Sequence, residues 1–187
     1  MKLILLVVCV LSCAVGCVTR QADYFYGLAA QPAGVPESGR IDRQVTLRLS
    51  LPSLVDRSEM VLATQDGVAV MEHERWAAPL ADLMTTTLRQ DIERRRGDVA
   101  VLSRGSDADV AALRIEVDVV QLTARRGAEV SIEAQWRITD TGTRKRSLGR
   151  DVFVAPVHAD GYAAVATALS SCVGLLADRL VKEIPSG

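Results

Sequence analysis

The sequence predicts an α+β fold, a two-layer sandwich in which two main amphipathic helices cover one face of a mostly antiparallel sheet. Three segments alternate apolar and polar residues, which is typical of strands with one buried face. Two longer segments repeat apolar residues at every third or fourth position, which is typical of helices with one buried side. Short joins rich in glycine and polar residues connect the alternating segments, so we expect neighbouring strands to run antiparallel.

The first residues of the chain have the composition of a bacterial lipoprotein signal, which we assign to residues 1–16. A basic residue precedes an apolar run over residues 3–15, and the small residue Gly16 comes directly before Cys17. This order is typical of a secretory signal peptide, and a cysteine after the break indicates acylation of its thiol. We therefore expect Cys17 to carry the acyl anchor. The alternatives are cleavage without lipid and a retained span, although a span needs about 20 apolar residues.

Two neighbouring residues refine this assignment. Cys13 also follows a lipobox-like stretch and stays an alternative acylation site, but Gly16 is a smaller residue than Ser12 and the apolar run before Cys17 is longer. Val18 stands where an aspartate would favour retention in the inner membrane. We therefore expect a lipid-anchored protein on the outer membrane of a Gram-negative cell, facing the periplasm.

The segment after the signal, residues 17–44, is expected to form the lipidated N-terminus and a tether, because it mixes polar residues with glycine and proline. The aromatic cluster at residues 24–26 indicates that part of this segment docks on the folded body. We assign residues 45–187 to one domain, since a chain of 187 residues suits a single core once the signal is removed.

Four short strands are predicted in the first half of the domain. Residues 45–51 place apolar residues at alternate positions, and Pro52 ends this strand. Residues 59–71 read as two short strands joined by a turn at the Asp-Gly pair of residues 66–67. Residues 99–102 are short and apolar and predict the fourth strand.

A first helix is predicted over residues 75–96. Its apolar residues recur at three- and four-residue spacing, at Trp76, Leu80, Leu83, Met84, Leu88 and Ile92. Proline is tolerated in a helix only within the first turn, so Pro79 places the start between Trp76 and Ala78.

Three alternating segments then predict an antiparallel meander with one buried face. The residues expected on that face are Leu113, Ile115, Val117 and Val119 in the first segment, Val130, Ile132, Ala134, Trp136 and Ile138 in the second, and Leu148, Val152 and Val154 in the third. The joins at residues 125–127 and 140–143 suit tight turns.

The second main helix is predicted over residues 160–183, with an apolar stripe that includes Cys172. Of the four cysteines, two lie in the signal and Cys17 is expected to be acylated, so Cys172 has no partner for a disulfide. We expect it to be buried as a small apolar residue. The formal net charge of −1 gives no indication of a nucleic-acid partner.

No catalytic or metal-binding constellation is found in the sequence. His73 and His158 are far apart and lack a carboxylate or cysteine at ligand spacing. The serine pair at residues 170–171 lies on a packed helix and lacks the flanking glycines of a nucleophile elbow. We therefore expect neither enzymatic activity nor a cofactor.

Three stretches stand out from this plain pattern. Residues 51–61 read LPSLVDRSEMV, residues 75–80 read RWAAPL and residues 25–28 read FYGL. Together they resemble the ABC-type transport auxiliary lipoprotein family of PqiC-like outer-membrane lipoproteins. The candidate residues in these stretches are Tyr26, Pro52, Asp56, Arg57, Trp76 and Pro79.

Two hypotheses describe the role of these candidate residues. In the first, the role is structural: Asp56 accepts backbone N–H bonds, Arg57 pairs with a carboxylate or carbonyl, and Trp76 fills the seam between sheet and helix. In the second, the residues contact a partner protein directly.

The resemblance also implies a function. It implies a non-catalytic auxiliary lipoprotein of an MCE/ABC-type lipid-transport system that maintains membrane integrity. Its partners would be an MCE-domain protein and the ABC transporter components, and it would hold to outer-membrane lipid by its acyl chains, such as palmitate. A homo-oligomeric ring is implied as well. The alternatives are a periplasmic lipid-carrying module with its own apolar cavity and a structural envelope lipoprotein or pilotin.

Overall fold

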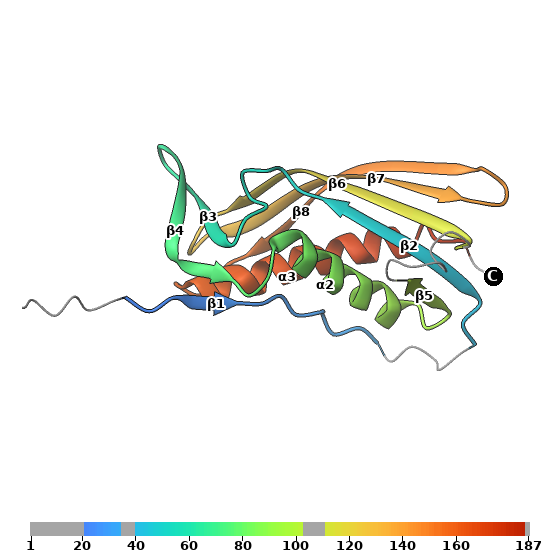
Figure 1. The fold of residues 1–187 in the computed structure, drawn as a ribbon, viewed down its shortest axis with the longest axis horizontal. Helices are drawn as coiled ribbons and strands as arrows, with labels where there is room; N and C mark the ends of the chain where they lie inside the picture. The colour runs from blue at the N-terminus through green and yellow to red at the C-terminus, as the bar shows by residue number, and fades with distance from the viewer. Residues whose placement is uncertain (1–20, 35–39, 103–110, 186–187) are drawn as a thin grey trace, which may run out of the picture.

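The computed structural model describes residues 21–34, 40–102 and 111–185, which form an α+β fold with two helices and two sheets (Figure 1). The small sheet has the strand order β1-β4-β3, and the large sheet has the order β5-β2-β6-β7-β8. The strands are β1 (Tyr24–Tyr26), β2 (Arg43–Ser50), β3 (Glu59–Thr64), β4 (Gly67–Trp76), β5 (Val99–Leu102), β6 (Leu113–Ala124), β7 (Glu129–Asp140) and β8 (Arg146–Pro156). The helices are α2 (Leu80–Arg95) and α3 (Tyr162–Val181).

Both helices pack on the same face of the large sheet, as predicted (Figure 1). Helix α2 contacts β2 and β5, helix α3 contacts β7 and β8, and the two helices also pack against each other. Strand β2 runs parallel to β5 and β6, whereas β6, β7 and β8 form the predicted antiparallel meander. Most paired residues therefore belong to antiparallel ladders.

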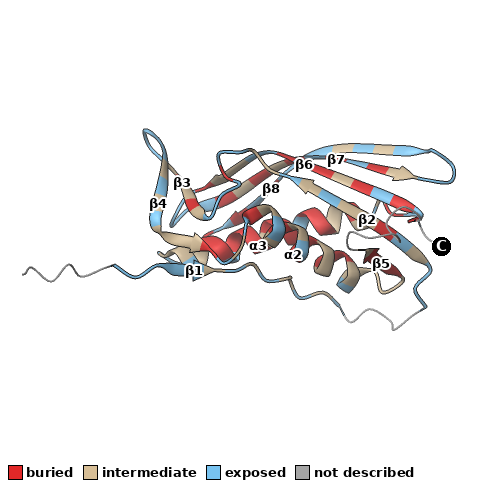
Figure 2. Ribbon diagram, viewed as in Figure 1, coloured by how far each residue is buried: buried red, intermediate tan, exposed pale blue. Residues whose placement is uncertain are grey.

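The core lies between the helices and the inner face of the large sheet (Figure 2). The alternation predicted for β6 and β7 is confirmed, since Ile115 and Val117 on β6 and Ile132 and Trp136 on β7 are all buried. Directly opposite residues of two strands point to the same side of a sheet. The ladder pairs Val117 with Trp136, so both strands present their apolar residues to the helices.

The face predicted for β8 is wrong. Leu148, Val152 and Val154 point to solvent, with exposed fractions of 70%, 54% and 46%, and Phe153 and Ala155 are buried instead. The register decides this, because it places Phe153 opposite Ile132 and Ala155 opposite Val130, two core residues. Farther along, the inward position belongs to Gly149, where an added Cβ would lie 2.3 Å from the indole of Trp136. The neighbouring strand thus fills the space that an apolar residue of β8 would need.

The predicted start of the first helix is also wrong. Strand β4 continues to Trp76, and α2 begins at Leu80 with Pro79 as its N-cap residue. The backbone N–H groups of Trp76 and Ala77 donate to the carbonyls of Ser58 and Tyr26 at 2.7 and 2.8 Å. Because these groups serve the small sheet, the helix cannot begin before the proline. The predicted hairpin is correct, and Gly67 adopts the positive φ of 144° after its turn.

Helix α3 forms the centre of the core. It is the one helix among the described residues that is long and apolar enough to cross a membrane. However, 61% of its most apolar stretch is buried inside the fold. Cys172 is buried on this helix, as predicted, and its Sγ lies 3.2 Å from the carbonyl oxygen of Val130. Burial raises the pKa of the Cys172 thiol to about 12, so the thiol is a packing group rather than a nucleophile.

Candidate functional site

The three stretches singled out in the sequence meet at the base of the small sheet. Strand β1 pairs with the end of β4, which places Tyr26 beside Trp76. The turn that follows Pro52 leads into β3, whose first residue Glu59 pairs with Arg75. We call Tyr26, Pro52, Asp56, Arg57, Trp76 and Pro79 the motif cluster. The fold thus brings together residues that lie far apart in the chain.

Pro52 and Asp56 build a turn that also supports helix α2. The carbonyl of Pro52 accepts bonds from the backbone N–H groups of Val55 and Asp56 at 3.0 and 3.1 Å. The Asp56 carboxylate accepts the backbone N–H of Ala81, in the first turn of α2, at 3.3 Å. A proline at the N-cap has no side-chain acceptor for the free N–H groups of a helix. Asp56 therefore supplies from the preceding turn the cap that Pro79 cannot provide.

Arg57 belongs to a chain of ion pairs on the outer side of the small sheet. The Glu59 carboxylate lies 3.0 Å from Arg57 and 3.1 Å from Arg75, and Arg75 also reaches Asp23 at 3.4 Å. The hydrogen bond from Arg57 is the main reason that the pKa of Glu59 lies below its usual value. The positive and negative groups on this side of the sheet therefore neutralise one another.

Tyr26 and Trp76 lie on the inner side of the small sheet. Trp76 is buried against the core, and the Tyr26 ring lies 6.4 Å from the ring of Tyr162 on α3. The Tyr26 hydroxyl donates a 2.6 Å hydrogen bond to the Glu74 carboxylate. Burial, with this bond as the second cause, raises the pKa of Tyr26 to about 12. Both aromatic side chains thus join the small sheet to the helices.

The segment after β1 crosses the seam between the two helices, and we call residues 27–34 the N-terminal strap. The backbone N–H of Ala29 donates to the Ser170 hydroxyl at 3.1 Å, and that of Gln31 donates to the Asp91 carboxylate at 2.8 Å. An added Cβ on Gly174 would lie 2.6 Å from the Gln31 side chain, so this glycine allows the close approach. The predicted docking of the tether is therefore observed over this part of it.

Asp91 is the residue under the strap that the sequence prediction missed. Its carboxylate is fully buried and forms a 2.9 Å ion pair with Arg95, which also bonds Asp178 of α3. Burial raises the pKa of Asp91, and the bonds from Gln31 and Arg95 oppose that rise. An aspartate on the stripe between Leu88 and Ile92 was the available signal, because a buried charge needs partners.

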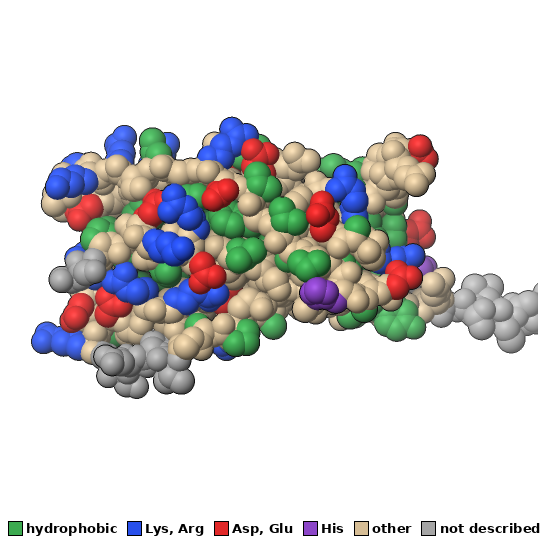
Figure 3. All heavy atoms as spheres, turned by 180° about the vertical axis from the view of Figure 1, so that it is seen from behind, with side chains coloured by type: hydrophobic (Ala, Val, Ile, Leu, Met, Phe, Trp, Pro, Cys, Tyr) green, Lys and Arg blue, Asp and Glu red, His purple; other side chains and the backbone are tan. Residues whose placement is uncertain are grey.

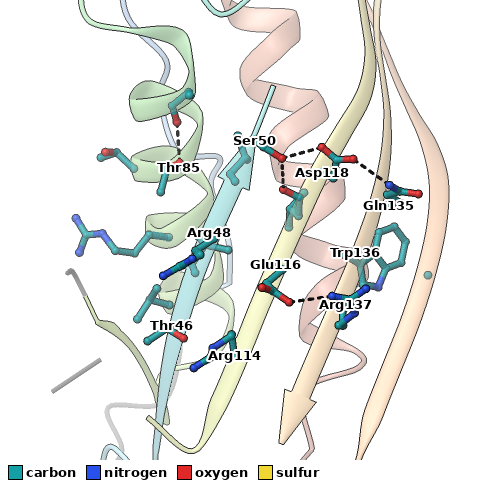
Figure 4. Close-up of a pocket in the computed structure, with 18 of the residues that line it drawn as sticks. Thr46, Arg48, Ser50, Thr85, Arg114, Glu116, Asp118, Gln135, Trp136 and Arg137 are labelled. Atoms are coloured by element: carbon teal, nitrogen blue, oxygen red, sulfur yellow. Dashed lines mark hydrogen bonds and ion pairs between the residues drawn. The ribbon is translucent and has the colours of Figure 1, made fainter. Parts of the chain in front are cut away.

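A surface groove of about 1350 Å³ runs along α2, β2 and the outer face of the large sheet (Figure 4). Its wall mixes polar and apolar side chains, and polar side chains of neighbouring strands bond to each other across it. Asp118 accepts bonds from Ser50 at 2.7 Å and from Gln135 at 2.9 Å, and Arg137 pairs with Glu116 at 3.3 Å. Among the described residues, no group of three or more His, Cys, Asp or Glu side chains is placed to hold a metal ion.

The apolar pocket between the small sheet and the helices is far smaller. It is lined by core side chains such as Met60, Trp76 and Leu169, and its volume is about 10 Å³. A space of that size holds at most about one water molecule. It is much too small for an acyl chain.

Comparison with known proteins identifies one family. The model of the family described as ABC-type transport auxiliary lipoprotein component matches residues 26–181, a range that includes the motif cluster and the whole strap. No curated protein sequence matches the chain at a significant level.

Two solved structures share the fold at low sequence identity. The structure of an uncharacterized protein covers 88% of this chain and 100% of its own length, with a TM-score of 0.69 and 18% identity. A protein from Xanthomonas campestris covers 84% of this chain and 92% of its own length, with a TM-score of 0.68 and 16% identity.

Proposed function

The chain belongs to the family of ABC-type transport auxiliary lipoprotein components, and on this premise we propose that it is a non-catalytic outer-membrane lipoprotein serving an MCE/ABC-type lipid-transport system. Membership of a lipoprotein family implies a membrane-anchored protein of the cell envelope. The outer membrane, the MCE-domain partner and lipid as the transported material are the further parts of this proposal.

The observation that carries the proposal is the way the anchored end of the chain is fastened to the domain. Strand β1 pairs with β4, and the N-terminal strap then bonds to Asp91 and Ser170 on the two helices. An acyl group on Cys17 would therefore be joined to a well-packed body by the short segment before β1 instead of by a tether that runs to residue 44. Such a body suits an adaptor, which has to present a fixed surface to a partner.

The alternative of a lipid-carrying module is less well supported. Lipid-binding sites are predominantly apolar, whereas the wall of the surface groove on this protein includes charged residues such as Arg48, Arg114 and Glu116 beside its apolar ones. The apolar pocket of about 10 Å³ is too small for a lipid. Native mass spectrometry of the detergent-extracted protein tests this alternative, because a co-purifying lipid of defined stoichiometry would favour the carrier.

The test of the anchor compares two cysteine variants. We expect Cys17→Ser to move the protein from the membrane fraction to the soluble periplasmic fraction and to weaken the outer-membrane barrier against detergents. Several acyl chains on one cysteine hold a protein to a bilayer far more firmly than a single chain does. Cys13→Ser is the matched control and should leave both the location and the barrier unchanged.

Each outcome of these tests bears on a different part of the proposal. If Cys17→Ser fully complements a deletion strain, tethering is dispensable. If Cys13→Ser, and not Cys17→Ser, releases the protein from the membrane, then Cys13 is the acylated residue. Separation of the two membranes on a density gradient tests the outer-membrane assignment, and co-purification with an MCE-domain protein tests the partner.

A further inference from the structure

The small sheet has an exposed apolar outer face. Val61 lies opposite Val70 and Ala63 lies opposite Val68 in the β3–β4 ladder, so these four side chains share one side of the sheet. Leu62, which lies between them in β3, is buried on the opposite side. The apolar side chain of Val68 is exposed to solvent, with an exposed fraction of 55%. This side of the hairpin thus shows valine and alanine side chains to the surroundings.

Phe25 extends this face at the base of the sheet. It lies opposite Arg75, on the side away from the buried Trp76, and it is exposed by 65%. We call Phe25, Val61, Ala63, Val68 and Val70 the outer patch. Arg57 and Arg75 form ion pairs with Glu59 and Asp23, two positive groups with two negative ones, so these four groups add no net charge to the patch.

The face shown in Figure 3 has a distribution of charge that does not favour a strongly charged partner. On the face shown in Figure 3, basic and acidic side chains lie close together with no large region of one sign. Hydrophobic side chains border the end of the molecule where the described chain begins. An apolar patch that includes an exposed aromatic ring, that of Phe25, suits the boundary between the headgroups and acyl chains of a zwitterionic bilayer.

The length of the leader limits how far this patch can be from the membrane. Tyr24 follows Cys17 by seven positions, and a fully extended chain of that length spans about 25 Å. Strand β1 lies at the same end of the molecule as the β3–β4 hairpin (Figure 1). An acylated Cys17 therefore keeps the small sheet within this distance of the headgroups.

We propose that the outer patch rests on the lipid bilayer in which Cys17 is anchored, so that the small sheet faces the headgroups and the far end of the large sheet points away. This inference depends on the proposed acylation of Cys17. The anchor holds the patch at a high local concentration beside the bilayer, so the contact can be too weak to recruit free protein and still orient the tethered domain.

The experiment measures contact between the patch and lipid in the full acylated chain. The protein is reconstituted in vesicles of phosphatidylethanolamine and phosphatidylcholine, and a fluorophore is attached to Val68→Cys. Cys172 does not compete for the label, because it is buried and its pKa is raised to about 12. The matched control is Val152→Cys on β8, since Val152 and Val68 have nearly equal exposed fractions of 54% and 55%.

We expect lipids with a nitroxide near the headgroup to quench the label at position 68 about twofold, because interfacial side chains enter the bilayer by about 5–10 Å. The label at position 152 should keep its fluorescence. Equal quenching at the two positions, or none at position 68, overturns the proposal. Mass analysis of the same sample separates this failure from that of the anchor, because a bare Cys17 contradicts the proposed function itself.

A second variant tests whether the apolar side chains make the contact. Phe25→Ser with Val70→Ser should abolish the quenching at position 68, whereas Leu148→Ser with Val154→Ser on β8 should leave it unchanged. All four residues are exposed, so their replacement should hardly affect folding. A label at position 68 that is shielded from water, unquenched by lipid and released on dilution would mean that a second copy covers the patch, which overturns the proposal.

Discussion

The large sheet and the small sheet differ in how their strands are held together. In the large sheet, β6, β7 and β8 run side by side over almost their whole length, and one face is buried under both helices. In the small sheet, β1 has only three residues, and the β3–β4 ladder is interrupted between Glu59 and Val61. The large sheet therefore depends on a repeated pattern, whereas the small sheet depends on a few individual contacts at its base.

The two faces of the small sheet also differ from each other. Its inner side carries Trp76 and Tyr26, which join it to the core, and its outer side carries the exposed outer patch. Changes on the inner side should affect the free energy of unfolding, and changes on the outer side should affect contact with the membrane. The predictions below test this division.

The largest effect is expected for Trp76→Ala. Removal of this buried indole leaves a cavity at the junction of the small sheet, α2 and the core, and we expect it to lower the free energy of unfolding by about 3–5 kcal/mol. Urea unfolding of the mature chain measures the change. Phe25→Ala, on the outer side, should cost less than about 0.5 kcal/mol. Similar losses for the two variants would mean that the small sheet does not unfold together with the core.

Gly149→Ala tests the inner face of β8. Its new Cβ would lie 2.3 Å from the indole of Trp136, whose ring nitrogen donates a 3.1 Å bond to Glu183. We expect a loss of about 1–3 kcal/mol, the range for overpacked cores, together with a change in tryptophan fluorescence. Gly142→Ala is the control, because the nearest atom to its Cβ would be at an ordinary 3.5 Å. An unchanged stability of the Gly149 variant would contradict the inward placement of this residue.

Asp56→Ala should have a smaller effect. The variant removes the acceptor for the Ala81 N–H, and loss of a helix cap costs about 0.5–2 kcal/mol. Asp56→Asn keeps an acceptor oxygen and should recover most of the stability. Binding to the partner, compared at equal amounts of folded protein, should stay the same in both variants. Loss of binding with an unchanged melting temperature would instead favour a direct partner contact by the motif cluster.

The smallest effect is expected for the pH dependence of stability that arises from the Arg96–Asp98 pair after α2. Arg96 donates two 2.7 Å bonds to Asp98, and these bonds lower the pKa of Asp98 from its ordinary value of 3.8. The folded state therefore favours the charged form of Asp98. The pair stabilises the folded protein at a pH above the ordinary pKa of 3.8, and this stabilisation is lost as the pH falls through the lowered pKa.

Asp98→Asn should thus be less stable than the wild type near neutral pH, by about 1 kcal/mol or less, as for pairs close to the protein surface. The difference should shrink as the pH is lowered toward about 3. Thermal melts of both proteins over this range measure it, and parallel pH profiles would exclude the contribution of this pair.

Much of the fold could be predicted from local pattern. Both helices, the alternation of β6 and β7, and the hairpin at Gly67 follow from residues that are neighbours in the chain. The motif stretches were also visible, although their meeting at the base of the small sheet depends on the parallel pairing of β1 with β4. The contact of the strap with Asp91 could not be predicted, because it joins residues sixty positions apart.

The sequence by itself determined the class of fold and the family resemblance, because these are carried by local periodicity and by short motifs, and the signal with its cysteine stays a prediction. The tertiary structure alone decided which side of β8 is buried, where α2 begins and which apolar residues of the small sheet stay exposed. The physical reason is the same in each case. An alternating strand has two possible faces, and only the register with its neighbour, such as Phe153 opposite Ile132, determines which face meets the core.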